Sequence, residues 1–222
     1  MPKKQKEKNK KKEENKEIDK QIVIINNISP PADEGQLRAI NLYGDINEGR
    51  AQEIVSALLY LESTSPKLIQ GPDPEAMEES LVINQDMKMF ISTHGGNVSD
   101  MFSIIDVMEM VKKNTCDIAT VGVGKVMSAG VPILASGTKG KRKIGKNCRI
   151  MLHGVASAVG GSIFRLENEL EEIRWVQEKY IECLSGCSKL TKPKLKKMIK
   201  SQKDVYISAE DAVKYGIVDE II

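Results

Sequence analysis

The chain has 222 residues, enough for one domain with a sizeable core, and 41 % of them are hydrophobic, an ordinary share for a globular protein. Residues 1–20 carry a net charge of +4 against +2 for the whole chain, so the remainder carries −2, which argues against a nucleic-acid-binding body. Four cysteines without a CxxC pair and only two histidines argue against a metal site and favour a reducing compartment. No apolar run has the length of a membrane span, and no apolar segment follows the N-terminal lysines as in a secretory signal. We therefore expect a cytoplasmic protein that engages neither membrane nor nucleic acid.

The sequence predicts a tail and one domain. Residues 1–17 are a low-complexity run of Lys, Glu and Asn that predicts a disordered tail, with a nucleic-acid or membrane-surface arm as the alternative. Residues 18–222 are predicted to form a single domain. Within it, residues 63–86 contain several prolines and little periodicity, which predicts an inserted loop longer than compact domains usually need.

Strands and helices are predicted to alternate through the domain. Apolar runs predict strands at residues 22–25, 39–46, 87–91, 118–123, 149–153, 205–207 and 217–218. Apolar residues spaced three and four apart predict helices at residues 48–61, 101–111, 129–135, 163–184 and 209–215. Ser208 and Asp211 form a capping box for the last helix, and Gly216 is its predicted stop. This alternation predicts an α/β fold.

The longest predicted helix, over residues 163–184, has an apolar stripe and a glutamate-rich back. Such a helix either contacts a partner subunit or packs on its own domain, and its pattern fits both alternatives. Cys183 and Cys187 lie four residues apart, and so on one face of this helix.

The chain is organised around residues 121–130, where a buried strand leads through Ser128 into a short apolar helix. Gly122 and Gly124 are expected to loosen the end of that strand. A serine at a strand-to-helix turn has free backbone N–H groups beside it, which is where a nucleophilic serine gains an oxyanion hole. The alternative is that Ser128 is an ordinary helix N-cap.

A nucleophilic serine needs an imidazole base and a carboxylate that holds the base. The chain offers only His94 and His153 as the base. His153 ends a predicted strand and Asp204 precedes another, so both could reach the same sheet edge as Ser128. The order Ser, His, Asp differs from the familiar serine hydrolases, and Val126 replaces the glycine of the G-x-S-x-G elbow, so spacing alone leaves this triad open.

Several ordered blocks of the sequence resemble ClpP, the family of proteolytic subunits of the Clp protease. The resemblance runs roughly from residue 38 to the end of the chain. The blocks are residues 124–130 and 135–142 around the serine, 147–153 around the histidine, 203–219 around the aspartate, and 93–96, which resembles a Ser-Pro-Gly-Gly loop, with a looser match at 42–46.

This resemblance implies a serine endopeptidase in which Ser128 is the nucleophile, His153 the base and Asp204 the residue that orients the base. Carried over by position, the oxyanion donors are the backbone N–H groups of Gly96 and Ala129. Glycine lets a loop amide turn inward, and Ala129 directly follows the nucleophile, so this assignment is physically reasonable.

The resemblance also implies a ClpP/crotonase-like fold of stacked βαβ units with a protruding handle helix over residues 161–187. The family's subunits stack as two rings, a tetradecamer, around a chamber in which unfolded polypeptides are cleaved. An AAA+ unfoldase usually feeds the chamber and uses ATP, so no cofactor is expected on this chain. An organelle stroma or matrix, or the host cytoplasm for a viral protein, are the alternatives to a cytoplasmic location.

The sequence departs from the family pattern at Val155, where a proline is usual, at Ala129, where a methionine is usual, and at His94, where a proline is usual. Because Ala129 would act through its backbone, we expect these changes to tune the substrate pocket rather than abolish catalysis. The insertion and the unusual N-terminus keep open a dedicated processing peptidase without an unfoldase. Two further alternatives are a non-catalytic ring subunit and an acyl-CoA hydratase or isomerase of the same superfamily, and the presence of all three triad residues counts against both.

Overall fold

The fold was analysed in a computed structural model that describes residues 38–65, 68–69, 82–83, 85–200 and 203–222. These residues belong to one compact unit that begins at Arg38 and ends at Ile222. The predicted tail over residues 1–17, the predicted strand over residues 22–25 and most of the predicted insertion lie outside the described residues. Within the described residues, no helix is long and apolar enough to cross a membrane.

The centre of the unit is a parallel sheet built from β1 (Ala39–Tyr43), β4 (Met87–Thr93) and β5 (Ile118–Met127), in the order β1-β4-β5. Alternate residues of β4 point into the core, and Met87, Met89 and Ile91 are all fully buried. The buried side chains of these strands are mostly aliphatic or methionine, which fits the low aromatic content of the chain, because few aromatic residues are available to fill the core.

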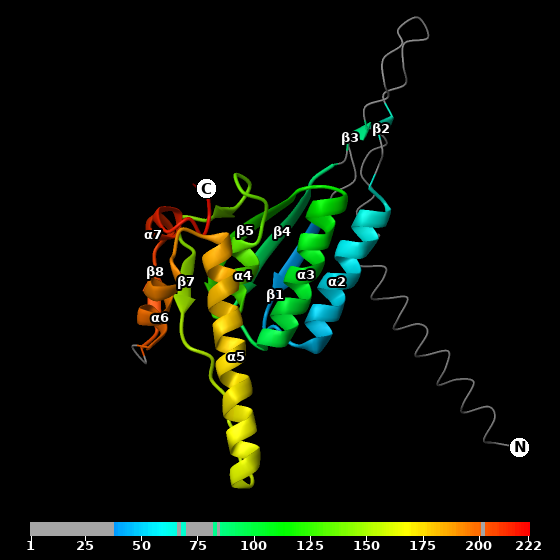
Figure 1. Cartoon of the computed structure of the whole chain (residues 1–222). Coiled ribbons are helices and arrows are strands. Elements are labelled where there is room, and N and C mark those ends of the chain that lie inside the picture. Colours follow the sequence, from blue (N-terminus) through cyan, green and yellow to red (C-terminus); the bar gives the residue numbers. More distant parts are fainter. Residues whose placement is uncertain (1–37, 66–67, 70–81, 84, 201–202) are drawn as a thin grey trace, which may run out of the picture. The chain divides into compact units, whose positions relative to one another are not determined.

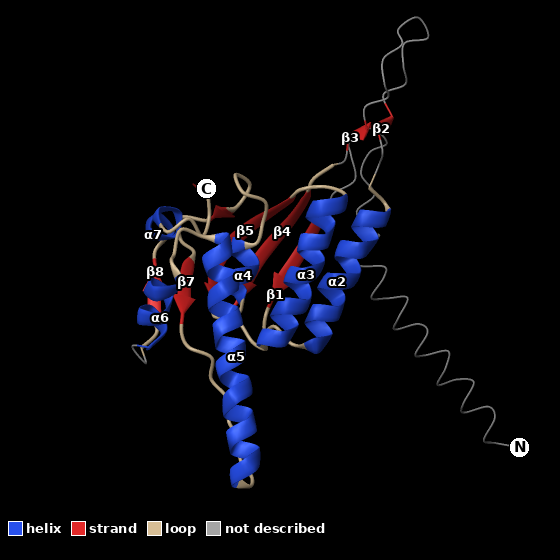
Figure 2. Cartoon of the chain, in the orientation of Figure 1, coloured by secondary structure: helices blue, strands red, loops and turns tan. Residues whose placement is uncertain are grey.

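Helices α2 (Glu48–Ser63), α3 (Val98–Asn114) and α4 (Gly130–Ala135) lie side by side on one face of the sheet, in front of the strands in Figure 2. The first two begin at asparagine N-caps, Asn47 and Asn97, whose side chains accept hydrogen bonds from the first turn. They bury the stripes that the apolar spacing predicted, for example Ile54 and Leu58 of α2. Each helix therefore connects one parallel strand to the next, as the alternation of elements predicted.

β5 pairs with different strands along its length. Near its start, Val121 and Gly122 pair with β6 (Lys143–Ile144), which in turn pairs with β9 (Glu220–Ile221). Near its end, residues 125–127 pair in parallel with β7 (Arg149–Leu152), and β7 pairs antiparallel with β8 (Val205–Ile207). The register with β4 shifts between Ile91 and Thr93, so Gly124 lies in a bulge inside β5, whereas Gly122 stays paired with Ile91.

The C-terminal half adds α5 (Ile163–Cys187), α6 (Lys192–Lys200) and α7 (Ala209–Lys214). α5 leans on α4 with its C-terminal half, while its N-terminal half projects away from the sheet (Figure 1). Only the C-terminal half of α5 is buried, through Tyr180, Ile181 and Leu184. Ser208 caps α7 by accepting a hydrogen bond from the backbone N–H of Asp211, and Gly216 follows with a φ of 65°, as the capping signals predicted.

Some predicted boundaries were wrong. The strand over residues 39–46 ends at Tyr43, and Ile46 forms only an isolated bridge with Gly96. The last strand is Glu220–Ile221 rather than residues 217–218, because Ile217 and Val218 are buried in the turn that follows α7. α6 was not predicted, and two short strands within residues 63–86, β2 (Leu68–Ile69) and β3 (Val82–Ile83), form an antiparallel pair.

Candidate active site

Ser128 occupies the turn between β5 and α4 with a φ of 52°, and it is the only non-glycine residue with positive φ among those the structure describes. That region of backbone space costs a residue with a Cβ on the order of 1 kcal/mol or more and is common at functional sites. The N-cap of α4 is Ala129, which makes no side-chain capping bond, so the alternative that Ser128 is an ordinary N-cap is wrong. The side chain of Ser128 is half-buried.

Three hydrogen bonds hold the backbone of Ser128 in this conformation. Its N–H donates to the carbonyl oxygen of Met151 in β7, at 2.8 Å. Its carbonyl oxygen accepts from the backbone N–H of Val131, at 3.0 Å, and from the hydroxyl of Tyr180 in α5, at 3.2 Å. The turn is therefore fixed by a strand, a short helix and the long helix together.

A glycine loop packs directly against the serine turn. A Cβ added to Gly95 would lie 2.6 Å from the Cβ of Ser128 and 3.0 Å from the amide nitrogen of Ala129. A Cβ added to Gly96 would lie 2.0 Å from the carbonyl oxygen of Ile46. Both glycines also have positive φ, so only glycine lets this loop approach the turn so closely.

Two backbone amides next to Ser128 are free to serve a ligand. The backbone N–H of Ile46 donates to the carbonyl oxygen of Gly95, and the carbonyl oxygen of Ile46 accepts from the N–H of Asn97. The N–H of Gly96, which lies between these two residues, takes no part in either bond. Among the described residues, neither the amide of Gly96 nor that of Ala129 donates to a protein acceptor. Free amides from two segments beside a serine are the arrangement that stabilises a developing oxyanion.

His153 and Asp204 lie at the same end of the sheet as Ser128. Met127 pairs with Met151, so Ser128 comes directly after the pairing of β5 with β7, and His153 comes directly after β7. Leu152 pairs with Val205 in the antiparallel ladder, so His153 and Asp204 follow as the next opposed positions. The three residues therefore project from adjacent strands, although they lie far apart in the sequence.

Strand pairing brings the three residues to one edge of the sheet without joining their side chains. Within the part of the chain that the structure describes, no hydrogen bond links the side chains of Ser128, His153 and Asp204. Catalytic hydrogen bonds are often long in ligand-free enzymes and shorten when substrate binds, so this arrangement is compatible with a triad. Asp204 and His94 are exposed, and His153 is half-buried.

Sequence reasoning missed one residue of this region, Tyr180. Its ring is buried, and burial raises the pKa of its hydroxyl well above the usual value, so it remains a neutral donor to the carbonyl oxygen of Ser128. The available signal was an aromatic residue with a polar tip on the apolar stripe of a glutamate-rich helix, since buried tyrosines usually have a hydrogen-bond partner.

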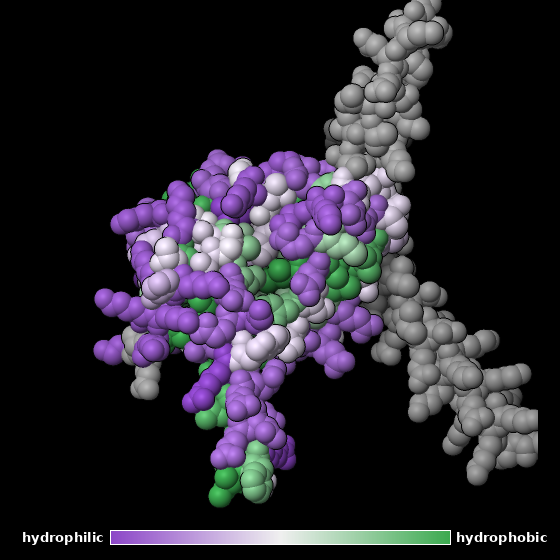
Figure 3. Space-filling model, viewed as in Figure 1, coloured by the Kyte–Doolittle hydropathy of each residue, from purple (hydrophilic) through white to green (hydrophobic). Residues whose placement is uncertain are grey.

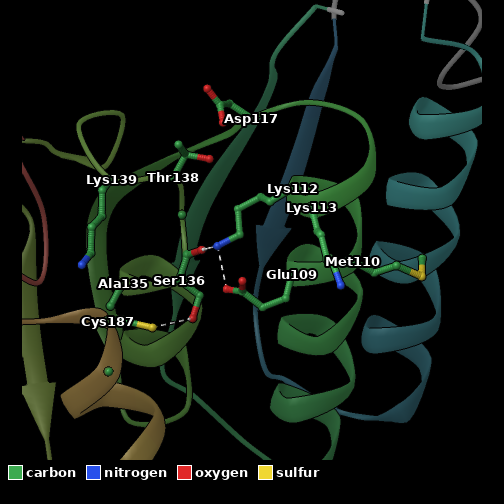
Figure 4. Close-up of a pocket in the computed structure, with 12 residues that line it drawn as sticks. Glu109, Met110, Lys112, Lys113, Asp117, Ala135, Ser136, Thr138, Lys139 and Cys187 are labelled. Carbon is green, nitrogen blue, oxygen red and sulfur yellow. Dashed lines mark hydrogen bonds and ion pairs between the residues drawn. The ribbon is translucent and has the colours of Figure 1, made fainter.

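A separate hollow of about 690 Å³ opens at the other end of β5, near Asp117 and the C-terminal end of α4 (Figure 4). Its lining includes Ser136, Lys112 and Cys187. The hollow lies at the C-terminal end of α4, whereas Ser128 precedes the start of that helix, and Ser128 is not among the residues that line the hollow.

Comparison with known proteins identifies the family. The model of the Clp protease family matches residues 77–222 of this chain. An ATP-dependent Clp protease proteolytic subunit from Borreliella afzelii (strain PKo) is 29 % identical over 185 residues, which cover 83 % of this chain and 83 % of that protein. The chain belongs to the Clp protease family, as a divergent member. Membership of this family, together with the α/β fold, supports a ClpP-type peptidase.

Proposed function

We propose that this chain is a serine endopeptidase that cleaves unfolded polypeptides through an acyl-enzyme. The observation that carries the proposal is the convergence of Ser128, His153 and Asp204 at the ends of the adjacent strands β5, β7 and β8. The positive φ of Ser128 supports it further, because backbone strain is retained only where the surrounding structure and function maintain it.

In the proposed reaction, the Oγ of Ser128 attacks the carbonyl carbon of the scissile peptide bond while His153 accepts its proton. Asp204 orients the imidazole and stabilises its positive charge. The tetrahedral intermediate then collapses, the C–N bond breaks, and His153 delivers the proton to the departing amine. A water molecule, deprotonated by His153, attacks the acyl-enzyme, and release of the acid regenerates the Ser128 hydroxyl.

The amides of Gly96 and Ala129 are proposed to donate to the oxyanion of that intermediate. They come from two different segments that are held together by the close packing of Gly95 on the serine turn. Such preorganised donors need no rearrangement when negative charge develops, and the loss of one typically costs about 10²- to 10³-fold in rate.

We also propose that the subunits assemble through the free half of α5. The assembly would be a tetradecamer of two stacked rings around a chamber. Apolar atoms gather at the projecting tip of α5 (Figure 3), where the side chains of Ile163 and Phe164 are 71 % and 79 % exposed. Apolar side chains left so exposed mark an interaction surface. An AAA+ unfoldase would deliver substrate to the chamber and hydrolyse ATP, and this chain would bind no cofactor of its own.

A fluorophosphonate probe tests the proposed chemistry, because an activated serine displaces its fluoride and becomes phosphonylated. We expect the wild-type protein to be labelled and Ser128→Ala to remain unlabelled, while Ser99→Ala, an exposed serine on α3, is labelled as the wild type. His153→Gln should abolish labelling and His94→Gln should preserve it, which uses the only other histidine of the chain as a matched control. Asp204→Asn should slow labelling on the order of ten-thousandfold, whereas Glu210→Gln should not.

Ser128 counts as the nucleophile only if Ser128→Ala loses labelling while its assembly is unchanged. Light scattering measures the assembly. An assembled wild-type protein that does not react with the probe, alone or with an added unfoldase, would favour a non-catalytic ring subunit and reject the proposal. Peptidase activity that an unfoldase does not stimulate would instead indicate a dedicated processing peptidase.

A further inference from the structure

Two thiols lie together at the C-terminal end of α5, on the turns that follow Tyr180. Cys183 and Cys187 are free and half-buried, one helical turn apart, whereas Cys116 and Cys148 are buried. Cys187 lines the hollow of about 690 Å³, and its Sγ lies 3.4 Å from the Oγ of Ser136, as the dashed line in Figure 4 marks. A small solute can therefore reach Cys187 through the hollow.

The surroundings of the pair shift the pKa values of the two thiols in opposite directions. A hydrogen bond from Cys183, helped by Ser136 and by the charge of Lys112, lowers the pKa of Cys187 to about 6, although burial and Glu109 oppose this. The same hydrogen bond, together with burial, raises the pKa of Cys183. Cys187 lines the hollow and Cys183 does not, so a solute in the hollow reaches the sulfur of Cys187 first. The lowered pKa of Cys187 favours the same order, with Cys187 as the reactive thiol and Cys183 as its resolving partner.

We propose that Cys183 and Cys187 form a peroxide-sensitive dithiol site on α5, with Cys187 as the attacking sulfur and Cys183 as the resolving one. The Cys187 thiolate attacks one oxygen of a hydroperoxide, the O–O bond breaks, and the departing oxygen takes up a proton, leaving Cys187 as a sulfenic acid. The sulfur of Cys183 then attacks the sulfur of Cys187, the S–O bond breaks, and hydroxide leaves with the Cys183 proton as water. The two electrons that the thiols lose are taken up by the peroxide.

Closing this disulfide requires the last turn of α5 to change. Residues four apart on a helix have Cβ atoms about 5–6 Å apart, whereas a disulfide needs about 3.5–4.5 Å. Gly186 lies between the two cysteines in open space at the rim of the hollow, and glycine weakens a helix by roughly 1 kcal/mol relative to alanine. The turn that must distort therefore contains the one glycine of α5.

The distortion would be transmitted through the backbone of Cys187. Its carbonyl oxygen accepts a hydrogen bond from Nη1 of Arg142 at 2.5 Å, and Arg142 is itself held by Asp219. Ser136, which contacts the Cys187 sulfur, is the C-cap of α4. Oxidation would therefore loosen α5 from both neighbours, at the end of α4 opposite to Ser128.

The test is peptide mapping of the full-length protein after treatment with hydrogen peroxide and alkylation of the remaining thiols. Trypsin releases residues 180–189 as one peptide with both cysteines, since it cleaves after Lys179 and Lys189. We expect this peptide to become lighter by two hydrogen atoms and unavailable to alkylation, and to recover both thiols with a reductant. In the untreated protein, Cys187 should be alkylated at least about tenfold faster than the buried Cys148.

Matched variants make the proposal falsifiable without any peptidase assay, so its outcome is independent of the role of Ser128. Cys183→Ser should accumulate a sulfenic acid on Cys187, trapped by dimedone, and should form no disulfide, whereas Cys148→Ser should behave as the wild type. Oxidation of Cys187 directly to a sulfinic acid in the wild-type protein, a disulfide between two chains, or equal oxidation of Cys148 would each overturn the proposal.

Discussion

The hydroxyl of Tyr180 lies 3.2 Å from the carbonyl oxygen of Ser128 and donates a hydrogen bond to it, which ties the long helix α5 to the turn that carries the candidate nucleophile. This contact joins the proposed assembly helix to the proposed chemistry, because the other half of the same helix projects from the domain (Figure 1). Changes in how α5 packs can therefore reach the geometry of Ser128 through one side chain.

Tyr180→Phe is expected to lower the rate of fluorophosphonate labelling by about threefold to tenfold, since small misplacements of a reacting group are costly. The free energy of unfolding should fall by only about 1 kcal/mol, the usual net value of one hydrogen bond. Chemical denaturation and labelling kinetics measure the two effects. An unchanged labelling rate with normal stability would show that Tyr180 does not position Ser128.

Gly95→Ala is expected to abolish labelling and to destabilise the fold by about 3 kcal/mol or more, because the added Cβ would overlap the serine turn at a positive φ. Gly160→Ala is the matched control, since a Cβ there meets nothing within 4 Å. Thermal unfolding and probe labelling of both variants distinguish the two sites, and similar effects in both would mean that the close packing at Gly95 is unimportant.

Ser128→Gly is expected to remove the candidate nucleophile and yet to stabilise the protein by about 1 kcal/mol relative to Ser128→Ala, because only glycine adopts a φ of 52° without strain. The comparison with alanine is needed because both variants lack the hydroxyl. Denaturant midpoints give the difference, and a glycine variant less stable than the alanine variant would contradict backbone strain at this position.

Asp219→Asn is expected to destabilise the fold by about 3 kcal/mol near neutral pH, because it leaves the buried guanidinium of Arg142 without its anion. Hydrogen bonds from Arg142 hold the pKa of Asp219 below its usual range. A carboxyl group with a depressed folded pKa adds stability above its unfolded pKa of about 4 and loses it as pH falls through the folded value. The melting temperature of the wild type should therefore fall below about pH 4, and the difference between wild type and variant should shrink there.

Phe164→Glu is expected to prevent the two rings from stacking while leaving each protomer folded, because this side chain is 79 % exposed and contributes nothing to the core. Analytical ultracentrifugation should give about half the mass of the wild-type assembly. Glu172→Gln, at another exposed position of α5, serves as the control and should assemble normally. A full-sized assembly of Phe164→Glu would exclude the tip of α5 from the interface.

The sequence by itself determined the α/β fold, most of its helices and the stop signals near its end. The caps of α7 illustrate why, since Ser208, Asp211 and Gly216 act over a few residues, and local chemistry is visible in a local pattern. The same holds for the longest helix, which the apolar spacing predicted over residues 163–184 and which the structure shows as Ile163–Cys187, because this spacing is sustained over many turns. α6 was missed because its apolar residues are few and lysines dominate it.

Only the tertiary structure decided what the conformation of Ser128 is and which residues surround it. The sequence offered an N-cap or a nucleophile at this position, and the left-handed backbone with its three hydrogen bonds from β7, α4 and α5 excludes the N-cap. Likewise, the sequence placed His153 and Asp204 at strand ends, but the pairing of β7 with both β5 and β8 decided that these ends are adjacent. Contacts between residues far apart in the chain depend on strand order and register, which no local pattern encodes.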